Sequence, residues 1–350
     1  MNAIAQKQNP LFAKFDDVMK SVLRVPAQNG VGSFWGRRKL LTYADMFCGI
    51  GGFHTAGDSL GMECVFACDI DEDVRTIYAE NYGIKPEGDI CQIDAANIPD
   101  HDVLCAGFPC QPFSIIGAGA GFADARGTLF FELARIIEAK APAAFVLENV
   151  KQLATHNKGK TLSRILEILR GLGYTVDYRI LNALNFGLPQ KRERVLIVGF
   201  RGETTGFNWP TRKLPMIPLS ELLEAKPDPS TFVSDRIKRK RHAAHKAKIK
   251  PAIWHENVAG NISSHPFSCA LRAGASYNYL LVDGERRLTP REMLRLQGFP
   301  DTFKIVGNDS SIRKQAGNSV PVPIVKHILE RVLHAERAES SEIKRAVKAA

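Results

Sequence analysis

Long apolar runs are missing from this sequence. No stretch reaches the ~18 consecutive apolar residues that suggest a membrane-spanning helix, although 45% of the 350 residues are hydrophobic. The first segment also lacks the apolar core of an export signal, because acidic and polar residues surround Phe15 and Val18. We therefore expect a soluble protein that works in the cytosol.

Cysteine is scarce and irregularly spaced. The seven cysteines make an odd count, and no two stand in a C-x-x-C spacing. This pattern argues against a disulfide framework and against a structural zinc site, so we expect no bound metal. Most of these cysteines are expected to be small buried core residues.

Acidic residues are the minority charge. The chain has 37 Asp and Glu against 47 Lys and Arg, which gives a net charge of +10 and a pI near 9.3. The positive electrostatic field of such a protein attracts polyanions, but many basic proteins bind no polyanion. Charge alone therefore leaves nucleic acid open as a partner.

Short apolar runs alternate with amphipathic stretches from Leu40 onward. This alternation predicts a doubly wound α/β fold with a mostly parallel sheet, which binds ligands at the carboxyl ends of its strands. The expected strands are 41–47, 62–68, 102–106, 143–148 and 194–200, and the expected helices are 71–82, 129–139 and 160–171.

The composition changes after Arg201, where the sequence becomes Pro-rich and basic. Helical periodicity returns at about 290–334. We therefore expect a second, smaller domain and a chain that returns to the first one. The predicted divisions are an N-terminal extension (1–39), a first domain (40–202), a second domain (203–286), a hinge and return segment (287–317), a C-terminal part of the first domain (318–336) and a charged tail (337–350).

A glycine-rich turn, Phe47 to Gly52, follows the first expected strand and opens a helix. Backbone N–H groups at such a turn can approach an anionic ligand. Asp69 ends the next strand 20 residues past Gly49, where a carboxylate can accept both ribose hydroxyls. This spacing fits NAD and S-adenosylmethionine equally well. Asp89 could accept from an adenine amine or simply cap a turn.

A cysteine and a glutamate follow two neighbouring strands. Cys110 lies between two prolines in Gly107 to Ser114, and Glu148 with Asn149 ends the strand at 143–148. A lone cysteine is more often structural, yet packing explains a stiff Pro-Cys turn at a strand end poorly. Sheet topology could bring this thiol and this carboxyl to one ligand.

Two arginines, Arg192 and Arg194, alternate at the start of the last strand. An extended chain puts both on the same side. They could form a surface ion-pair cluster or bind an anionic or carbonyl ligand.

Taken in order, these segments resemble the bacterial C5-cytosine DNA methyltransferases, closely along 41–202 and again along 286–334. The shared segments are the glycine turn, Pro109-Cys110-Gln111, Glu148-Asn149-Val150, Gln190-Lys191-Arg192-Glu193-Arg194, the stretch 288–300 and Gln315 to Pro321. Five or more segments in the family's order are far more specific than any one of them.

The resemblance implies that 40–202, with 318–336, is a catalytic and cofactor-binding domain and that 203–286 is a target-recognition domain. It also implies roles for single residues. Cys110 is the implied nucleophile on a flipped cytosine, Glu148 contacts N3 and the exocyclic amine, and Arg194 binds the base carbonyl. Arg192 and Asn149 support that pocket. S-adenosylmethionine is the implied cofactor, with the expected contacts Phe47 on the adenine, Gly49 and Gly51 near the methionine part, Asp69 on the ribose, Asp89 on the adenine amine, and Ile90, Pro109, Asn318 and Ser319 completing the site.

Cytosine C6 is inaccessible within a stacked duplex, so the base must be flipped out. The glycine-rich loop 111–128 is expected to close over it, with Ser114 and Arg126 able to touch phosphates, although it could be an ordinary surface loop. The basic run 236–250, which includes Lys238, Arg239, Lys240 and Arg241, is either a solvated helix face or a phosphate-contacting one.

Within 271–278 Arg272 could read guanine and Asn278 adenine, unless that stretch is only a strand-turn-strand element. We expect a monomer acting on double-stranded DNA beside a restriction endonuclease. The nearest alternative is an RNA (tRNA) cytosine-5 methyltransferase, whereas an NAD dehydrogenase or a non-catalytic DNA-binding module would leave Cys110, Glu148 and Arg194 unexplained. One departure concerns Ile70, because some relatives have Glu-Trp where this chain has Asp-Ile.

Overall fold

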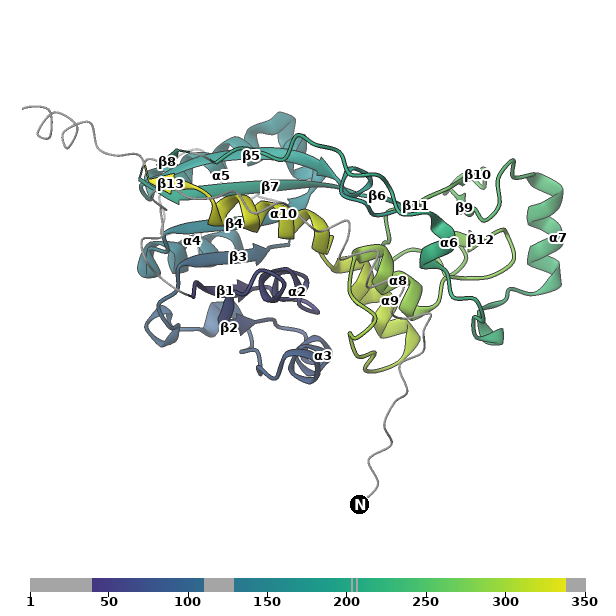
Figure 1. Cartoon of the computed structure of the whole chain (residues 1–350), viewed down its shortest axis with the longest axis horizontal. Helices are drawn as coiled ribbons and strands as arrows, with labels where there is room; N and C mark the ends of the chain where they lie inside the picture. Colours follow the sequence, from purple (N-terminus) through teal and green to yellow (C-terminus); the bar gives the residue numbers. More distant parts are fainter. Residues whose placement is uncertain (1–39, 110–128, 203, 206, 338–350) are drawn as a thin grey trace, which may run out of the picture.

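The computed structural model describes residues 40–109, 129–202, 204–205 and 207–337. Figure 1 shows one large sheet with helices on both faces and a smaller region beside it. Besides short 3-10 turns, the elements are β1 (Thr42–Met46), α2 (Gly52–Asp58), β2 (Glu63–Cys68), α3 (Glu72–Tyr82), β3 (Val103–Gly107), α4 (Leu129–Lys140), β4 (Ala144–Val150), α5 (Lys160–Gly171), β5 (Tyr174–Asn182), β6 (Gln190–Lys191), β7 (Glu193–Arg201), β8 (Thr204–Thr205), α6 (Leu219–Leu222), α7 (Asp235–Ala244), β9 (Ile253–Glu256), β10 (Ile262–His265), β11 (Ser268–Cys269), β12 (Leu280–Val282), α8 (Pro290–Gln297), α9 (Asp309–Asn318), α10 (Val322–Leu333) and β13 (Glu336–Arg337).

The large sheet has the strand order β2-β1-β3-β4-β7-β5. Strands β2, β1, β3 and β4 run parallel to one another, and β7 runs antiparallel between β4 and β5. The predicted mostly parallel α/β sheet is confirmed. Because the order reverses at β1, the carboxyl ends of β1 and β3 form the topological switch point where such sheets bind ligands.

Alternate residues of each strand face opposite layers, as the two-residue period of a strand requires. In β3, Val103 and Cys105 belong to one core cluster and Leu104 and Ala106 to the other. Helices α2, α3 and α10 cover the first face, whereas α4 and α5 cover the second. Two apolar layers therefore hold the sheet rigid, which fixes its carboxyl edge.

The last long helix, α10, returns to the large sheet. Its Ile324, Val325 and Ile328 are fully buried in the cluster that contains Val146 of β4 and Val198 of β7. The chain therefore comes back to the sheet after residue 290, as the renewed helical periodicity predicts.

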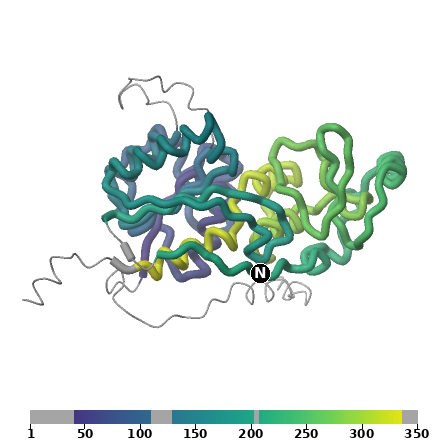
Figure 2. Tube along the Cα trace, turned by 90° about the horizontal axis from the view of Figure 1, so that it is seen from above, coloured from purple at the N-terminus to yellow at the C-terminus, as the bar shows by residue number. Residues whose placement is uncertain are grey.

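A small sheet with the order β10-β9-β12 forms the core of the region after β8, and α7 packs beside it. Helices α8 and α9 lie between this region and the large sheet, as both views show (Figures 1 and 2). Leu271, Met293 and Ala316 share one buried cluster, so the two parts are joined by apolar packing. None of the helices in the described ranges has the length and apolar character to cross a membrane.

Candidate active site

A cavity of about 450 Å³ opens at the carboxyl edge of β1, β3 and β4. One end holds the side chains implied to bind cofactor, and the other holds Glu148 and Arg194. The lining residues are Phe47, Gly49, Cys68, Asp69, Ile70, Asp71, Val74, Gly88, Asp89, Ile90, Gly107, Phe108, Pro109, Leu129, Glu148, Asn149, Val150, Arg194, Gln315, Gly317, Asn318 and Ser319.

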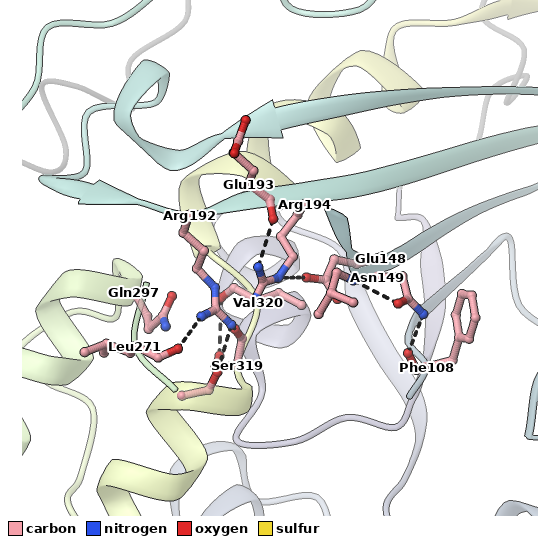
Figure 3. Close-up of polar contacts among 12 residues, drawn as sticks. Phe108, Glu148, Asn149, Arg192, Glu193, Arg194, Leu271, Gln297, Ser319 and Val320 are labelled. Atoms are coloured by element: carbon pink, nitrogen blue, oxygen red, sulfur yellow. Dashed lines mark hydrogen bonds and ion pairs between the residues drawn. The ribbon is translucent and has the colours of Figure 1, made fainter. Parts of the chain in front are cut away.

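Glu148 and Arg194 form an ion pair on neighbouring antiparallel strands. Arg194 lies opposite Val150 on β4, two residues beyond Glu148, so the two side chains project to the same face. Arg194 Nε donates to Glu148 Oε1 at 2.8 Å, as Figure 3 shows. Burial raises the pKa of the Glu148 carboxyl, and the positive charges of Arg194 and Arg192 lower it. The effect of burial is larger, so the pKa of Glu148 lies above its ordinary value. Glu148 therefore holds a proton more readily than an exposed glutamate does.

Asn149 fixes the turn that leads to position 110. Its Nδ2 donates to the Phe108 carbonyl at 2.8 Å, and its Oδ1 accepts from the Val150 N–H at 2.9 Å. Phe108 is itself buried against Phe130. The chain is thus held firmly up to Pro109, which lines the cavity. Cys110, Ser114 and Arg126 lie outside the described residues.

Arg192 joins three distant parts of the chain. Its guanidinium is 1% exposed and donates to the carbonyls of Leu271 (2.9 Å), Gly317 (2.9 Å) and Ser319 (2.7 Å). Burial lowers its pKa to about 9, which still leaves the side chain cationic at neutral pH. Arg192 and Arg194 extend to the same side of the strand (Figure 3), as their alternation predicts. Arg192 does not line the cavity; it supports the cavity from behind.

Asp69 organises the glycine turn at the other end of the cavity. Gly49 donates its N–H to Asp69 Oδ2 at 3.0 Å, and Asp71 donates its N–H to Oδ1 at 3.0 Å. Burial raises the pKa of Asp69. Phe47 adopts φ 53° in this turn and lines the same cavity.

Gly51 also has a structural role. It caps α2 at φ 83° and is absent from the cavity lining. A Cβ at this position would lie 2.2 Å from the ring of Tyr82, whose hydroxyl donates to the Gly51 carbonyl at 2.9 Å. This close approach of an aromatic ring requires a glycine, and the contact of Gly51 with the methionine part of the cofactor stays a prediction.

The chemistry of this end of the cavity fits a nucleoside cofactor. Two carboxylates, Asp69 and Asp89, and an aromatic ring, Phe47, face one space. Ile70 lines it as well and is 72% exposed, so an apolar side chain stands open where an adenine ring would cover it. Of the predicted cofactor contacts, eight line the cavity: Phe47, Gly49, Asp69, Asp89, Ile90, Pro109, Asn318 and Ser319.

Asp71 belongs to this site, although its sequence position alone marks only a helix cap. It accepts from the N–H groups of Asp73 and Val74 at the start of α3. Its other oxygen, Oδ2, accepts from Lys314 Nζ at 2.8 Å and from Gln315 Nε2 at 3.3 Å. These contacts tie α9 to α3 across the cavity.

Arg241 is a correction to the predicted phosphate contacts. Its side chain is buried, pairs with Glu256 at 2.5 Å and donates to the Asn278 carbonyl. The helical period turns position 241 toward the small sheet, while Arg239 and Lys240 remain exposed and Lys238 is half-buried. Arg241 anchors α7 and cannot reach a phosphate.

The two residues of the predicted recognition loop that were expected to read bases differ in exposure. Arg272 is exposed, with its guanidinium 4.9 Å from the centre of the Tyr279 ring. Asn278 differs, because its amide oxygen is buried within the domain. Asn278 as a whole is half-buried, and its contact with an adenine stays a prediction.

The fold and the cavity together define a class: a nucleoside-cofactor enzyme with a buried carboxyl–guanidinium pair at the substrate end. Comparison with known proteins specifies the family. The model of the C-5 cytosine-specific DNA methylases matches residues 41–334, so the chain belongs to that family. The family takes its methyl group from S-adenosylmethionine.

Individual relatives agree with this assignment. The chain is 56% identical over 285 residues to the Type II methyltransferase M.NgoBI of Neisseria gonorrhoeae, a match that covers 81% of this chain and 90% of that protein. It is 50% identical over 307 residues to M.HaeII of Haemophilus aegyptius, covering 87% and 96%. Its fold is similar to the crystal structure of the S. pombe Dnmt2 methyltransferase, with a TM-score of 0.64, 20% identity and coverage of 84% and 98%.

Proposed function

We propose that this DNA (cytosine-5)-methyltransferase acts on a flipped-out cytosine in a defined duplex site through a covalent bond between Cys110 Sγ and C6. The buried Glu148–Arg194 pair, 2.8 Å apart at one end of the cofactor cavity, is the observation that carries the proposal. Cytosine offers such a pair an unprotonated ring nitrogen that accepts a proton, flanked by an exocyclic amine and a carbonyl oxygen.

The chemistry requires an acid and a cation at these positions. Cytosine C5 is a poor nucleophile until a thiolate adds at C6, because the ring is aromatic. Addition of the Cys110 thiolate moves an electron pair toward N3 and C5. Protonated Glu148 donates to N3, and Arg194 stabilises negative charge at the O2 carbonyl. The raised pKa of Glu148 suits this role, since it keeps the carboxyl protonated to higher pH.

When bound, S-adenosylmethionine supplies an electrophilic methyl group to C5. Asp69 and Asp89 hold the ribose and the adenine amine in this proposal, and Phe47 packs on the adenine. A base then removes the C5 proton, and the electron pair forms the C5–C6 double bond and expels the Cys110 thiolate. N3 returns its proton to Glu148, which restores the neutral aromatic ring and the protonated carboxyl.

The DNA contacts belong to the region around α7 and the 271–278 loop. Exposed Arg239 and Lys240, with half-buried Lys238, contact phosphates, and Arg272 reads a base edge. M.NgoBI and M.HaeII are named Type II methyltransferases. By analogy we propose that this chain is a monomeric modification enzyme in a bacterial cytoplasm, paired with a restriction endonuclease.

Methylation of a plasmid of known sequence tests the proposal. The purified chain is incubated with the plasmid and S-adenosylmethionine, and bisulfite sequencing then reads every cytosine. The proposal predicts conversion-resistant cytosines at one recurring sequence. A parallel reaction with total tRNA tests the alternative substrate, and methylation of tRNA with none in DNA would overturn the proposal.

A further inference from the structure

A second cavity, of about 260 Å³, lies on the other side of α9 from the cofactor cavity. Its walls include Arg272 from the recognition loop, Arg287 from the segment before α8 and Arg313 from α9. Asp309 is the one acid among its described lining residues. The excess of positive charge marks a site for an anion.

Within the part of the chain that the structure describes, no carboxylate forms an ion pair with Arg272, Arg287 or Arg313. Arg287 donates to the Ser230 carbonyl at 2.6 Å, and one nitrogen of Arg313, Nη2, donates to the carbonyls of Ala275 and Ser276. A guanidinium has five N–H donors. Each of these two side chains is thus held in place with donors left over.

Two tyrosines hold the arginines together. The guanidinium carbons of Arg313 and Arg287 lie 4.4 Å and 5.7 Å from the centre of the Tyr277 ring. Tyr279 stacks with Arg272 at 4.9 Å on the next wall. Like charges gathered around shared rings repel one another, so an anion that binds between them gains from all of them.

We propose that this cavity is a phosphate-binding pocket in which Arg287 and Arg313, gathered at Tyr277, seat one backbone phosphate of duplex DNA, while Arg272, beside Tyr279 at its wall, is left to read a neighbouring base. The proposal rests on the proposed function, because DNA is the polyanion that this enzyme meets. Guanidinium groups suit phosphate oxygens, which they bind in pairs. Tyr277 is 51% exposed and can lie against the adjoining sugar.

The position of the pocket suggests what a bound phosphate would do. Arg313 holds the recognition loop through Ala275 and Ser276. The same helix, α9, continues to Gln315 and Asn318, which line the cofactor cavity. A phosphate anchored here would fix the register of the duplex against both the loop and the flipped base. Phosphate contacts position a protein on DNA, and base contacts select the sequence.

The first test replaces Arg287, which belongs neither to the recognition loop nor to the catalytic cavity. The affinity of the Arg287→Ala variant for the methylated sequence and for a scrambled duplex is measured across a salt series. Removal of one phosphate contact should lower the slope of log K against log salt by about 0.9 on both duplexes. Arg164→Ala on α5, an exposed arginine paired with Glu167, is the matched control and should not change the slope.

A neutral-phosphate scan locates the contact. Methylphosphonates are placed one at a time along the duplex, and one position should weaken binding by the wild-type chain but not by Arg287→Ala. Asp309→Asn, which removes the acid of the pocket, should tighten binding on both duplexes. If Arg287→Ala melts early, Arg287→Gln, which can still donate to Ser230, takes its place.

An unchanged salt slope together with an unchanged methylphosphonate profile would overturn the proposal. A loss of affinity confined to the cognate duplex would also overturn it, because it would show base reading instead of phosphate binding. Methylation by the wild-type chain is scored separately, so a chain that methylates DNA but shows either result disproves only the pocket and not the proposed function.

Discussion

The carboxyl edge of the large sheet, where we propose catalysis, and the region around α7, where we propose DNA reading, position their side chains by different means. At the edge, strand register alone brings Glu148 and Arg194 together, because β4 and β7 are paired along seven residues from Ala144 to Val150. In the other region the strands β9, β10 and β12 have only four, four and three residues. There single side chains such as Arg241 and Arg313 fix the helices and loops. Residues at strand ends can therefore be predicted from the sequence, whereas the positions of side chains on loops depend on tertiary contacts.

The largest effect is expected at the catalytic edge. Glu148→Gln should lower kcat by about 10²- to 10⁴-fold, because the amide cannot transfer a proton to N3. Burial raises the pKa of Glu148, so wild-type activity should fall as pH rises through that pKa. Single-turnover rates across pH should show this descending limb in the wild type and not in the variant. If the variant keeps the limb, another group is the acid.

The connection between the two regions should give the next largest effect. Arg192→Met leaves the carbonyls of Leu271, Gly317 and Ser319 without their donor. Unpaired buried acceptors cost about 1–3 kcal/mol each, not fully additively, so unfolding in urea should show a loss of roughly 3 kcal/mol. Arg201→Met, at the exposed end of β7, is the control and should change stability by less than about 0.5 kcal/mol. Equal losses would show that the three hydrogen bonds do not bear on stability.

Recognition should respond to a single loop side chain. Arg272→Ala should lose about 1–3 kcal/mol of discrimination, roughly 5- to 150-fold, if Arg272 reads a base edge. Competition between cognate and singly substituted duplexes at fixed salt measures this loss. Discrimination that survives at every position would place Arg272 with the backbone-contacting residues.

The smallest effect per residue is expected along α7. Replacing Lys238, Arg239 and Lys240 with alanine should reduce the salt slope by up to about 0.9 for each phosphate that is no longer neutralised, with little effect on stability. Arg241→Ala should do the opposite: it leaves Glu256 without its partner and destabilises the domain by about 1–3 kcal/mol. An unchanged slope in the triple variant would show a merely solvated helix face.

Sequence reasoning predicted the elements whose periodicity is local. The strands β1, β2, β3, β4 and β7 and the helices α3, α4 and α5 lie within a few residues of their predicted ranges. β5 was missed, although Val176 and its neighbours alternate between buried and exposed positions. At the cavity, the position of a carboxyl or a guanidinium at a strand end was enough to predict that Glu148 and Arg194 lie at one site.

The remaining features depend on partners far away in the chain. Arg192 bonds to carbonyls 79, 125 and 127 residues later, and Asp71 pairs with Lys314 across 243 residues. No local pattern specifies such pairings. The packing role of Gly51 was missed because the ring that requires a glycine belongs to Tyr82. Arg241 was misread because the helical period places it against a sheet that the sequence pattern did not reveal.

The most direct test of the central claim is covalent trapping. A duplex that carries 5-fluorocytosine at the methylated position blocks the last step, since fluorine cannot leave C5 as a proton does. With S-adenosylmethionine present, we predict a one-to-one protein–DNA adduct, mapped by mass spectrometry to the peptide containing Cys110 and absent from Cys110→Ser. An adduct at another residue, or one that persists in Cys110→Ser, would contradict the assignment of Cys110 as the nucleophile.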